Sequence, residues 1–212
     1  MRGFLQTAIQ AAKEAEGVIL QHFDSGVPVE RKADDTEVTI ADKEAERTIR
    51  NIILDTFPDH GFLGEETGKS DSDSDYVWIV DPIDGTRNYS RGIPLFGTLI
   101  ALMKESELIL GVVNMPALGH LSYAEKGKGA YMNGKKIHVS DTKDLKEAYV
   151  SFGGIKKFQK NNLTHELSSL IEASRADRGL GDCFSYTLIA QGKVDVLVDA
   201  TIKVWDVAAP AI

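Results

Sequence analysis

The feature that most constrains this chain is an apolar run, Val77–Val80, followed at once by Asp-Pro-Ile-Asp-Gly-Thr at residues 81–86. The apolar run predicts a buried strand, whereas two carboxylates, a proline and a glycine disfavour its continuation. If the strand ends at Asp81 and a helix begins near Asp84, both carboxylates and the carbonyl of Ile83 converge on one side of the turn. We therefore expect a buried strand to end in a cluster of oxygen atoms.

Such a cluster suits a hard divalent cation, because Mg²⁺ and Mn²⁺ prefer oxygen ligands. The histidines are scattered and Cys183 is the only cysteine, so the sequence carries no zinc pattern. At the start of the expected helix, the amides of Gly85 and Thr86 would offer an anion site beside the cation site. The alternative is an Asx turn in which an aspartate only caps the helix.

The composition is that of a folded globular protein, with 42% hydrophobic and 26% charged residues. Acidic residues outnumber basic ones by 32 to 24, and the basic residues do not cluster. We therefore expect no nucleic-acid or membrane partner. The single cysteine and the polar N-terminus predict a cytoplasmic protein without a signal peptide.

Hydrophobic periodicity predicts two amphipathic helices in the first part of the chain, over Leu5–Ile19 and Ala45–Phe57. Thr39 is the expected N-cap of the second helix, with Asp42 at the capping-box position. Short apolar or alternating runs from Val77 onward then predict a largely antiparallel sheet.

A tight hairpin is expected at Asn133-Gly134. A polar joint at Ser140–Lys146 divides the chain into an N-terminal α+β domain, residues 1–140, and a C-terminal α/β domain, residues 141–212. The elements expected after the joint are Ala148–Phe152 (strand), Thr164–Ser174 (helix), Phe184–Gln191 (helix), Val194–Val198 (strand) and a helix starting at Asp206.

Four segments together resemble the inositol monophosphatase family of metal-dependent, lithium-sensitive phosphatases. They are "VTIAD" (residues 38–42), "FLGEE" (62–66), "WIVDPIDGTRNY" (78–89) and "KVWDVAAP" (203–210), and their order and approximate spacing match as well. The resemblance implies an α/β fold, the layered αβαβα sandwich of the inositol monophosphatase and fructose-1,6-bisphosphatase type.

The resemblance also implies a set of site residues. Two or three Mg²⁺ ions would be held by Glu65, Asp81, the carbonyl of Ile83, Asp84 and Asp206. Thr86 with Glu65 would orient the attacking water, the amides of Gly85 and Thr86 would hold phosphate, and Asp42 would act through a water molecule on a metal. Because metal ions activate the water and stabilise the leaving group, no phosphoenzyme is needed.

The second half of the chain carries the substrate prediction. The run "GDCFSY" at residues 181–186 resembles the histidinol-phosphate phosphatase branch of the family, where inositol phosphatases usually have small residues. Asp182 would pair with a substrate ammonium group, unless it only caps the helix that follows. By the same resemblance, Asp199 would contact the alcohol part of the substrate.

Two classes of function stay open at this point. The first is a Mg²⁺-dependent phosphomonoesterase acting on a small phosphate ester: histidinol phosphate, then inositol monophosphate, then nucleotide 3′-phosphates or fructose bisphosphate. The second is a metal-binding scaffold without turnover. Family members usually continue past the position of Ile212. We therefore expect part of the C-terminal core to be missing, and exposed apolar surface to favour oligomerisation, as a homodimer, or instability.

Overall fold

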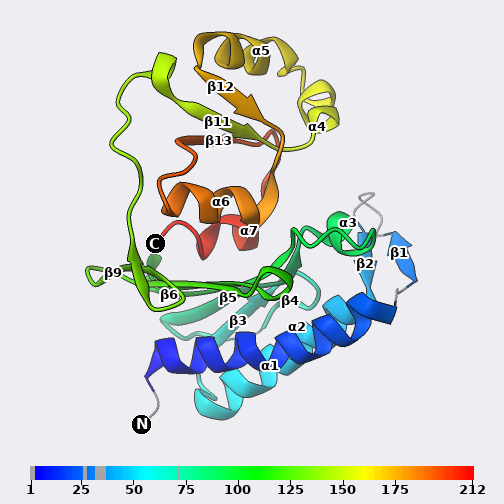
Figure 1. Ribbon diagram of the computed structural model, residues 1–212. Coiled ribbons are helices and arrows are strands. Elements are labelled where there is room, and N and C mark those ends of the chain that lie inside the picture. Colours follow the sequence, from blue (N-terminus) through cyan, green and yellow to red (C-terminus); the bar gives the residue numbers. More distant parts are fainter. Residues whose placement is uncertain (1–2, 26–27, 32–36, 71) are drawn as a thin grey trace.

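The computed structural model describes residues 3–25, 28–31, 37–70 and 72–212. Five layers follow one another in Figure 1: two long helices, a large sheet, two short helices, a small sheet and a last pair of helices. This arrangement confirms the predicted αβαβα sandwich. The helices, in the order of the layers, are α1 (Phe4–Ser25) and α2 (Ile40–Thr56), α6 (Asp182–Ala190) and α7 (Val204–Ala208), and α4 (Ile155–Lys160) and α5 (Thr164–Ala173).

The large sheet has the strand order β10-β9-β8-β7-β6-β5-β3-β4. All neighbouring strands in it are antiparallel except β3 and β5, so the predicted antiparallel character is largely confirmed. The strands are β3 (Gly61–Gly64), β4 (Gly68–Lys69), β5 (Tyr76–Asp84), β6 (Gly97–Lys104), β7 (Glu107–Met115), β8 (His120–Glu125), β9 (Gly129–Met132) and β10 (Lys135–Ile137).

The hairpin between β9 and β10 turns at the predicted dipeptide. Asn133 and Gly134 both have positive φ, 47° and 77°, as a two-residue primed turn requires. The separate two-stranded ribbon of β1 (Val29–Arg31) and β2 (Glu37–Thr39) was not predicted.

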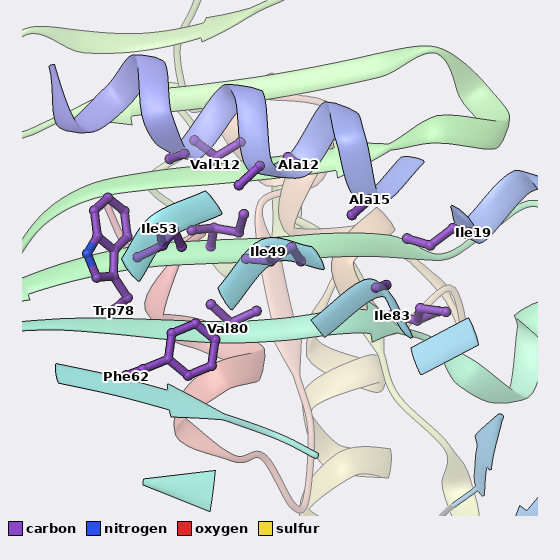
Figure 2. Close-up of a cluster of buried hydrophobic side chains, with 14 of the residues drawn as sticks. Ala12, Ala15, Ile19, Ile49, Ile53, Phe62, Trp78, Val80, Ile83 and Val112 are labelled. Atoms are coloured by element: carbon purple, nitrogen blue, oxygen red, sulfur yellow. The ribbon is translucent and has the colours of Figure 1, made fainter. Parts of the chain in front are cut away.

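The main core lies between the two long helices and the large sheet. Figure 2 shows Ile49 and Ile53 of α2 facing Phe62, Trp78 and Val80 of the sheet. The side of α1 that faces them is rich in alanine, which keeps the helix close to the sheet. This face of the sheet is therefore closely packed where β3 and β5 approach their ends.

A second, smaller core holds the two short helices against the opposite face of the sheet. Cys183 of α6 and Ala208 and Ala209 at the end of α7 pack with Ile79 and Leu99. A side chain on Gly111 of β7 would begin 2.1 Å from the carbonyl oxygen of Ala209, so α7 lies directly on the strand backbone. The starts of both helices are thereby placed near the end of β5.

The strand β5 differs from the sequence prediction. It continues through Pro82 to Asp84 instead of ending at Asp81, and its pairing with β6 shifts in register between Asp81 and Asp84. A bulge of this kind accommodates a proline that lacks an N–H to donate. The helix α3 (Thr86–Tyr89) follows two residues later, after Gly85.

The small sheet has the order β12-β11-β13, and its strands are parallel. Several predicted boundaries need small corrections: α6 starts at Asp182 rather than Phe184, and α7 at Val204 rather than Asp206. The predicted helix at Thr164–Ser174 is confirmed. The strands are β11 (Tyr149–Phe152), β12 (Ala176–Arg178) and β13 (Val196–Val198). Neither β12, α4, β3 nor β4 was predicted, and the division into domains 1–140 and 141–212 stays a prediction.

Candidate active site

The first turn of α2 brings Asp42 to the site. Its Oδ2 accepts hydrogen bonds from the backbone N–H and the hydroxyl of Thr39, at 2.7 and 2.6 Å, which confirms the predicted capping box. Its other oxygen, Oδ1, lies 3.4 Å from the hydroxyl of Thr86. Burial raises the pKa of Asp42 to about 6. Asp42 therefore both caps α2 and reaches the loop that follows β5.

Three carboxylates meet at the end of β5. Asp81 and Asp84 come from that strand and Asp206 from the first turn of α7, and one oxygen of each lies within 4.8 Å of the others. Among the described residues, Oδ1 of Asp81 is buried without a hydrogen-bond partner. Burial, followed by the charge of Glu65, raises the pKa of Asp81 well above its usual value.

Buried carboxylates this close repel one another unless a cation lies between them. An all-oxygen donor set of this kind fits a hard divalent ion such as Mg²⁺ or Mn²⁺. The residues present therefore fit the predicted metal.

Glu65 approaches the same place from the end of β3. Its N–H donates to the carbonyl of Val80 at 3.1 Å, and its side chain lines the same cavity as Asp81 and Asp84. The hydroxyl of Thr86 lies 3.0 Å from the carbonyl oxygen of Ile83. The turn after β3, the bulge of β5 and the start of α3 thus converge.

Gly85 is the N-cap residue of α3, so the alternative in which Asp84 merely caps this helix is wrong. Gly85 has a φ of 86°, and a side chain there would begin 2.9 Å from the carbonyl oxygen of Leu95. Only glycine fits this conformation without strain. The helix α3 has four residues, so the expected contribution of a helix dipole is small.

The start of α6 forms the opposite wall. The backbone N–H of Cys183 donates to Oδ2 of Asp84, and burial, followed by the charge of Asp182, raises the pKa of Asp84. Gly181 is the N-cap residue of α6, whereas the side chain of Asp182 accepts a hydrogen bond from Asn88 at 3.4 Å. The alternative in which Asp182 only caps α6 is therefore wrong.

Most of these groups border one open cavity of about 330 Å³. Its acidic side is opposed by three cationic side chains at the rim, Arg87, Lys156 and Lys157. The predicted site residues that line it are Glu65, Asp81, Ile83, Asp84, Gly85, Thr86, Asp182 and Asp206. Of the remaining two, Asp42 reaches the cavity through Thr86, and Asp199 does not line it.

Asp199 instead lies against the backbone of Gly153, just before α4, with Oδ1 3.6 Å from Nζ of Lys157. Its charge still contributes to raising the pKa of Asp182 and of Asp206, for both of which burial is the main cause. Asp199 therefore lies close to the cavity without lining it, and its contact with the alcohol part of the substrate stays a prediction.

The sequence reasoning missed three kinds of residue. Asn88 orients Asp182, the rim lysines come from the unpredicted helix α4, and Glu46 is a fully buried carboxylate on α2. Only Glu46 left a signal, because a charged residue stands among the apolar positions of the buried stripe Ala45, Ile49 and Ile53.

The comparisons with known proteins agree with this geometry. A family model described as the inositol monophosphatase family matches residues 1–212. A histidinol-phosphatase of Chlorobaculum parvum is 41% identical over 206 residues, which cover 97% of this chain and 80% of the relative. A fructose-1,6-bisphosphatase/inositol-1-monophosphatase of Aquifex aeolicus is 33% identical over 220 residues, covering 99% and 81%.

A solved structure, the extragenic suppressor protein suhB of Bartonella henselae, superposes with a TM-score of 0.90 at 29% identity and covers 97% of this chain and 81% of its own. Fold, acid cluster and relatives define a phosphatase of the metal-dependent class. The chain belongs to the inositol monophosphatase family. None of the described helices combines the length and apolarity needed to span a membrane.

Proposed function

We propose that this phosphatase uses Mg²⁺ to hydrolyse histidinol phosphate to histidinol and inorganic phosphate. The observation that carries the substrate assignment is the position of Asp182, whose carboxylate lies in the cavity wall beside Asp84. A carboxylate there can form a charge-assisted hydrogen bond with a substrate ammonium group. A neutral polyol carries no positive charge with which to make such a pair. The similarity to a histidinol-phosphatase of Chlorobaculum parvum supports the same substrate.

The metal ions would be held by Glu65, Asp81, the carbonyl of Ile83, Asp84 and Asp206, which border the cavity. When bound, Mg²⁺ lowers the pKa of a coordinated water and neutralises charge on the leaving oxygen. We propose that at least two ions bind, and the donor set leaves room for a third. Because all the donors are oxygen atoms, Mn²⁺ can replace Mg²⁺.

The protein's own groups orient the reactants. Asp42 and the carbonyl of Ile83 fix the hydroxyl of Thr86, at 3.4 and 3.0 Å, so that its oxygen and the carboxylate of Glu65 hold the attacking water. The amides of Gly85 and Thr86 bind phosphate oxygens, and Gly85 has no side chain in their way. Water attacks phosphorus in line, the bond to the substrate alcohol breaks, and inorganic phosphate leaves.

Turnover of a substrate panel tests this proposal. Purified protein should release phosphate from histidinol phosphate in Mg²⁺ faster than from inositol 1-phosphate, glycerol phosphate or fructose 1,6-bisphosphate, and should lose activity in excess chelator. Preference for inositol phosphate would overturn the substrate while leaving the metal chemistry intact. Full activity in chelator would overturn the mechanism, and no turnover of any ester would favour a scaffold.

Asp182→Asn tests the residue that carries the substrate assignment. Loss of a charge-assisted hydrogen bond of about 1.5–3 kcal/mol should lower kcat/KM for histidinol phosphate roughly ten- to hundredfold. The same variant should act on glycerol phosphate nearly as wild type does, and Asp141→Asn, an exposed aspartate outside the cavity, should change neither rate. Equal losses on both esters would mean that Asp182 has only a structural role.

Lithium inhibition, a homodimer and a cytoplasmic location stay predictions based on the family resemblance and the sequence composition.

A further inference from the structure

We propose that Glu46 is a positioning residue, which holds the turn after β3 so that Glu65 points into the metal cavity. Glu46 does not line the cavity and acts through the backbone of residues 64–67. The inference rests on the proposed function only in treating Glu65 as a metal ligand.

The carboxylate of Glu46 is fully buried under the turn. Its Oε2 accepts a hydrogen bond from the N–H of Glu66, and its Oε1 one from the N–H of Thr67, both at 2.8 Å. Buried carboxylates are rare unless both oxygens are paired, and here each oxygen has its own amide. The side chain is therefore matched to two consecutive N–H groups of one turn.

Gly64 makes this close approach possible. A side chain at Gly64 would begin 2.4–2.6 Å from the carboxylate atoms of Glu46, so the carboxyl group lies against the strand backbone where β3 ends. The turn itself spans Glu65–Thr67, because Gly64 pairs with Gly68, which has a φ of 71°. Glycine adopts this left-handed conformation without strain.

Glu65 is consequently fixed on both sides. Its own N–H donates to the carbonyl of Val80 on β5, and the next two N–H groups donate to Glu46 on α2. The orientation of the Glu65 side chain thus depends on two elements that also carry Asp42 and Asp81. Glutamine at position 46 would keep the shape but offer one acceptor oxygen to two donors.

A purely structural role would stabilise the fold without affecting metal binding, so the test must separate the two. We compare Glu46→Gln with Ile49→Val, which removes one methylene from the same buried face of α2 about one turn further on. Affinity for Mn²⁺ is measured by calorimetry on the full, metal-free chain. Hydrogen exchange is measured on the segment 61–70.

Glu46→Gln should weaken Mn²⁺ binding about 10- to 100-fold, the usual effect of losing a group that orients a ligand, and should speed exchange at Glu66 and Thr67. Ile49→Val should lower the midpoint of unfolding but leave Mn²⁺ affinity and exchange in the turn unchanged. Wild-type affinity in Glu46→Gln, or an equal loss in Ile49→Val, would overturn the proposal.

Gly64→Ala provides an independent variant in case Glu46→Gln does not fold. It displaces the same carboxylate, so it should weaken Mn²⁺ binding similarly, and the double variant should lose less than the sum of the two effects. Additive losses would mean that the residues act separately and would overturn the inference. Failure of wild-type protein to bind Mn²⁺ would overturn the proposed function, while exchange at Glu66 and Thr67 would still decide whether Glu46 holds the turn.

Discussion

Asp84 depends on three separate segments of the chain. It sits at the end of β5, accepts a hydrogen bond from the N–H of Cys183 at the start of α6, and lies within 4.8 Å of a carboxylate oxygen of Asp206 on α7. Burial, followed by the charge of Asp182, raises its pKa. An ionised Asp84 therefore costs free energy in the metal-free protein, and a cation would remove that cost.

Asp84→Asn should separate function from stability. Asparagine keeps an oxygen that can accept from the Cys183 N–H but removes the negative charge. We therefore expect kcat/KM and Mn²⁺ affinity to fall at least about a hundredfold, more than when a residue that only orients a metal ligand is changed. The unfolding free energy in chelator at pH 7.5 should be unchanged or higher. Urea unfolding and calorimetry measure the two quantities. Wild-type turnover at ordinary Mg²⁺ concentrations would show that Asp84 is not a ligand.

At the scale of elements, the sequence predicted those features that depend on contacts between residues close together in the chain. The capping box at Thr39, the turn at Asn133 and the helix over Thr164–Ser174 depend on neighbours in sequence, and all three are confirmed. The continuation of β5 past Pro82 was not predictable, because it depends on pairing with β6, including the 2.8 Å bond from the Thr98 hydroxyl to the carbonyl of Pro82.

The same distinction, between features set by the local sequence and features set by distant contacts, holds for the candidate site. The carboxylates of "DPIDGT" and the distant Asp206 were found through motifs, and the structure brings them together. Asp199 does not line the cavity and instead lies 3.6 Å from Lys157 of the unpredicted α4, so its contact with the substrate stays a prediction. Glu46 was missed because its partners are backbone amides, which no motif shows.

The junction of α2 and β5 contains a titratable ring whose effect on stability can be predicted. His60 stacks between Phe57 and Tyr76, with ring centroids 4.8 Å away on each side, and its Nδ1 accepts a hydrogen bond from Nε1 of Trp78 at 3.0 Å. Partial burial lowers the pKa of His60, although the charge of Asp59 opposes this. Protonation would also turn the acceptor nitrogen into a donor facing the indole N–H.

Because the folded-state pKa lies below the ordinary value of 6.5, His60 destabilises the protein only as pH falls below about 6.5. His60→Phe keeps the stacked ring but leaves the indole N–H unpaired, so it should be less stable than wild type at pH 7.5. The difference in unfolding free energy should narrow between pH 7.5 and 5.5, as urea unfolding at each pH would measure. A constant difference would mean that His60 does not titrate in this range.

At the scale of the whole molecule, the layered fold brings early and late parts of the chain to one cluster of like charges. Asp42 comes from the first helical layer, Asp81 from the large sheet and Asp206 from the helices on its other face. Burial raises the pKa of each of them. Ionising these three carboxylates together therefore costs free energy at one place in the fold. A bound cation would offset that repulsion and link the layers that carry them.

The sign of the resulting pH dependence follows from the raised pKa values. The pKa of Asp42 rises from 3.8 to about 6, so its contribution to stability is fully present below about pH 4 and is lost as pH rises through 6. The pKa values of Asp81 and Asp206 are also raised, so their contributions change with pH in the same direction. Metal-free protein should accordingly lose stability between pH 5.5 and 7.5, when measured in the His60→Phe background to remove the opposing titration.

Divalent metal should reverse this loss. Mg²⁺ at a hundred times its Kd should raise the unfolding free energy by about 2.7 kcal/mol for each ion bound at pH 7.5, by mass action on the folded state alone. At pH 5.5 protons compete for the same carboxylates, so the same Mg²⁺ concentration should stabilise less. Urea unfolding with Mg²⁺ and with chelator at both pH values measures the difference. Equal stabilisation at both would show that the buried carboxylates are not the groups that bind the ion.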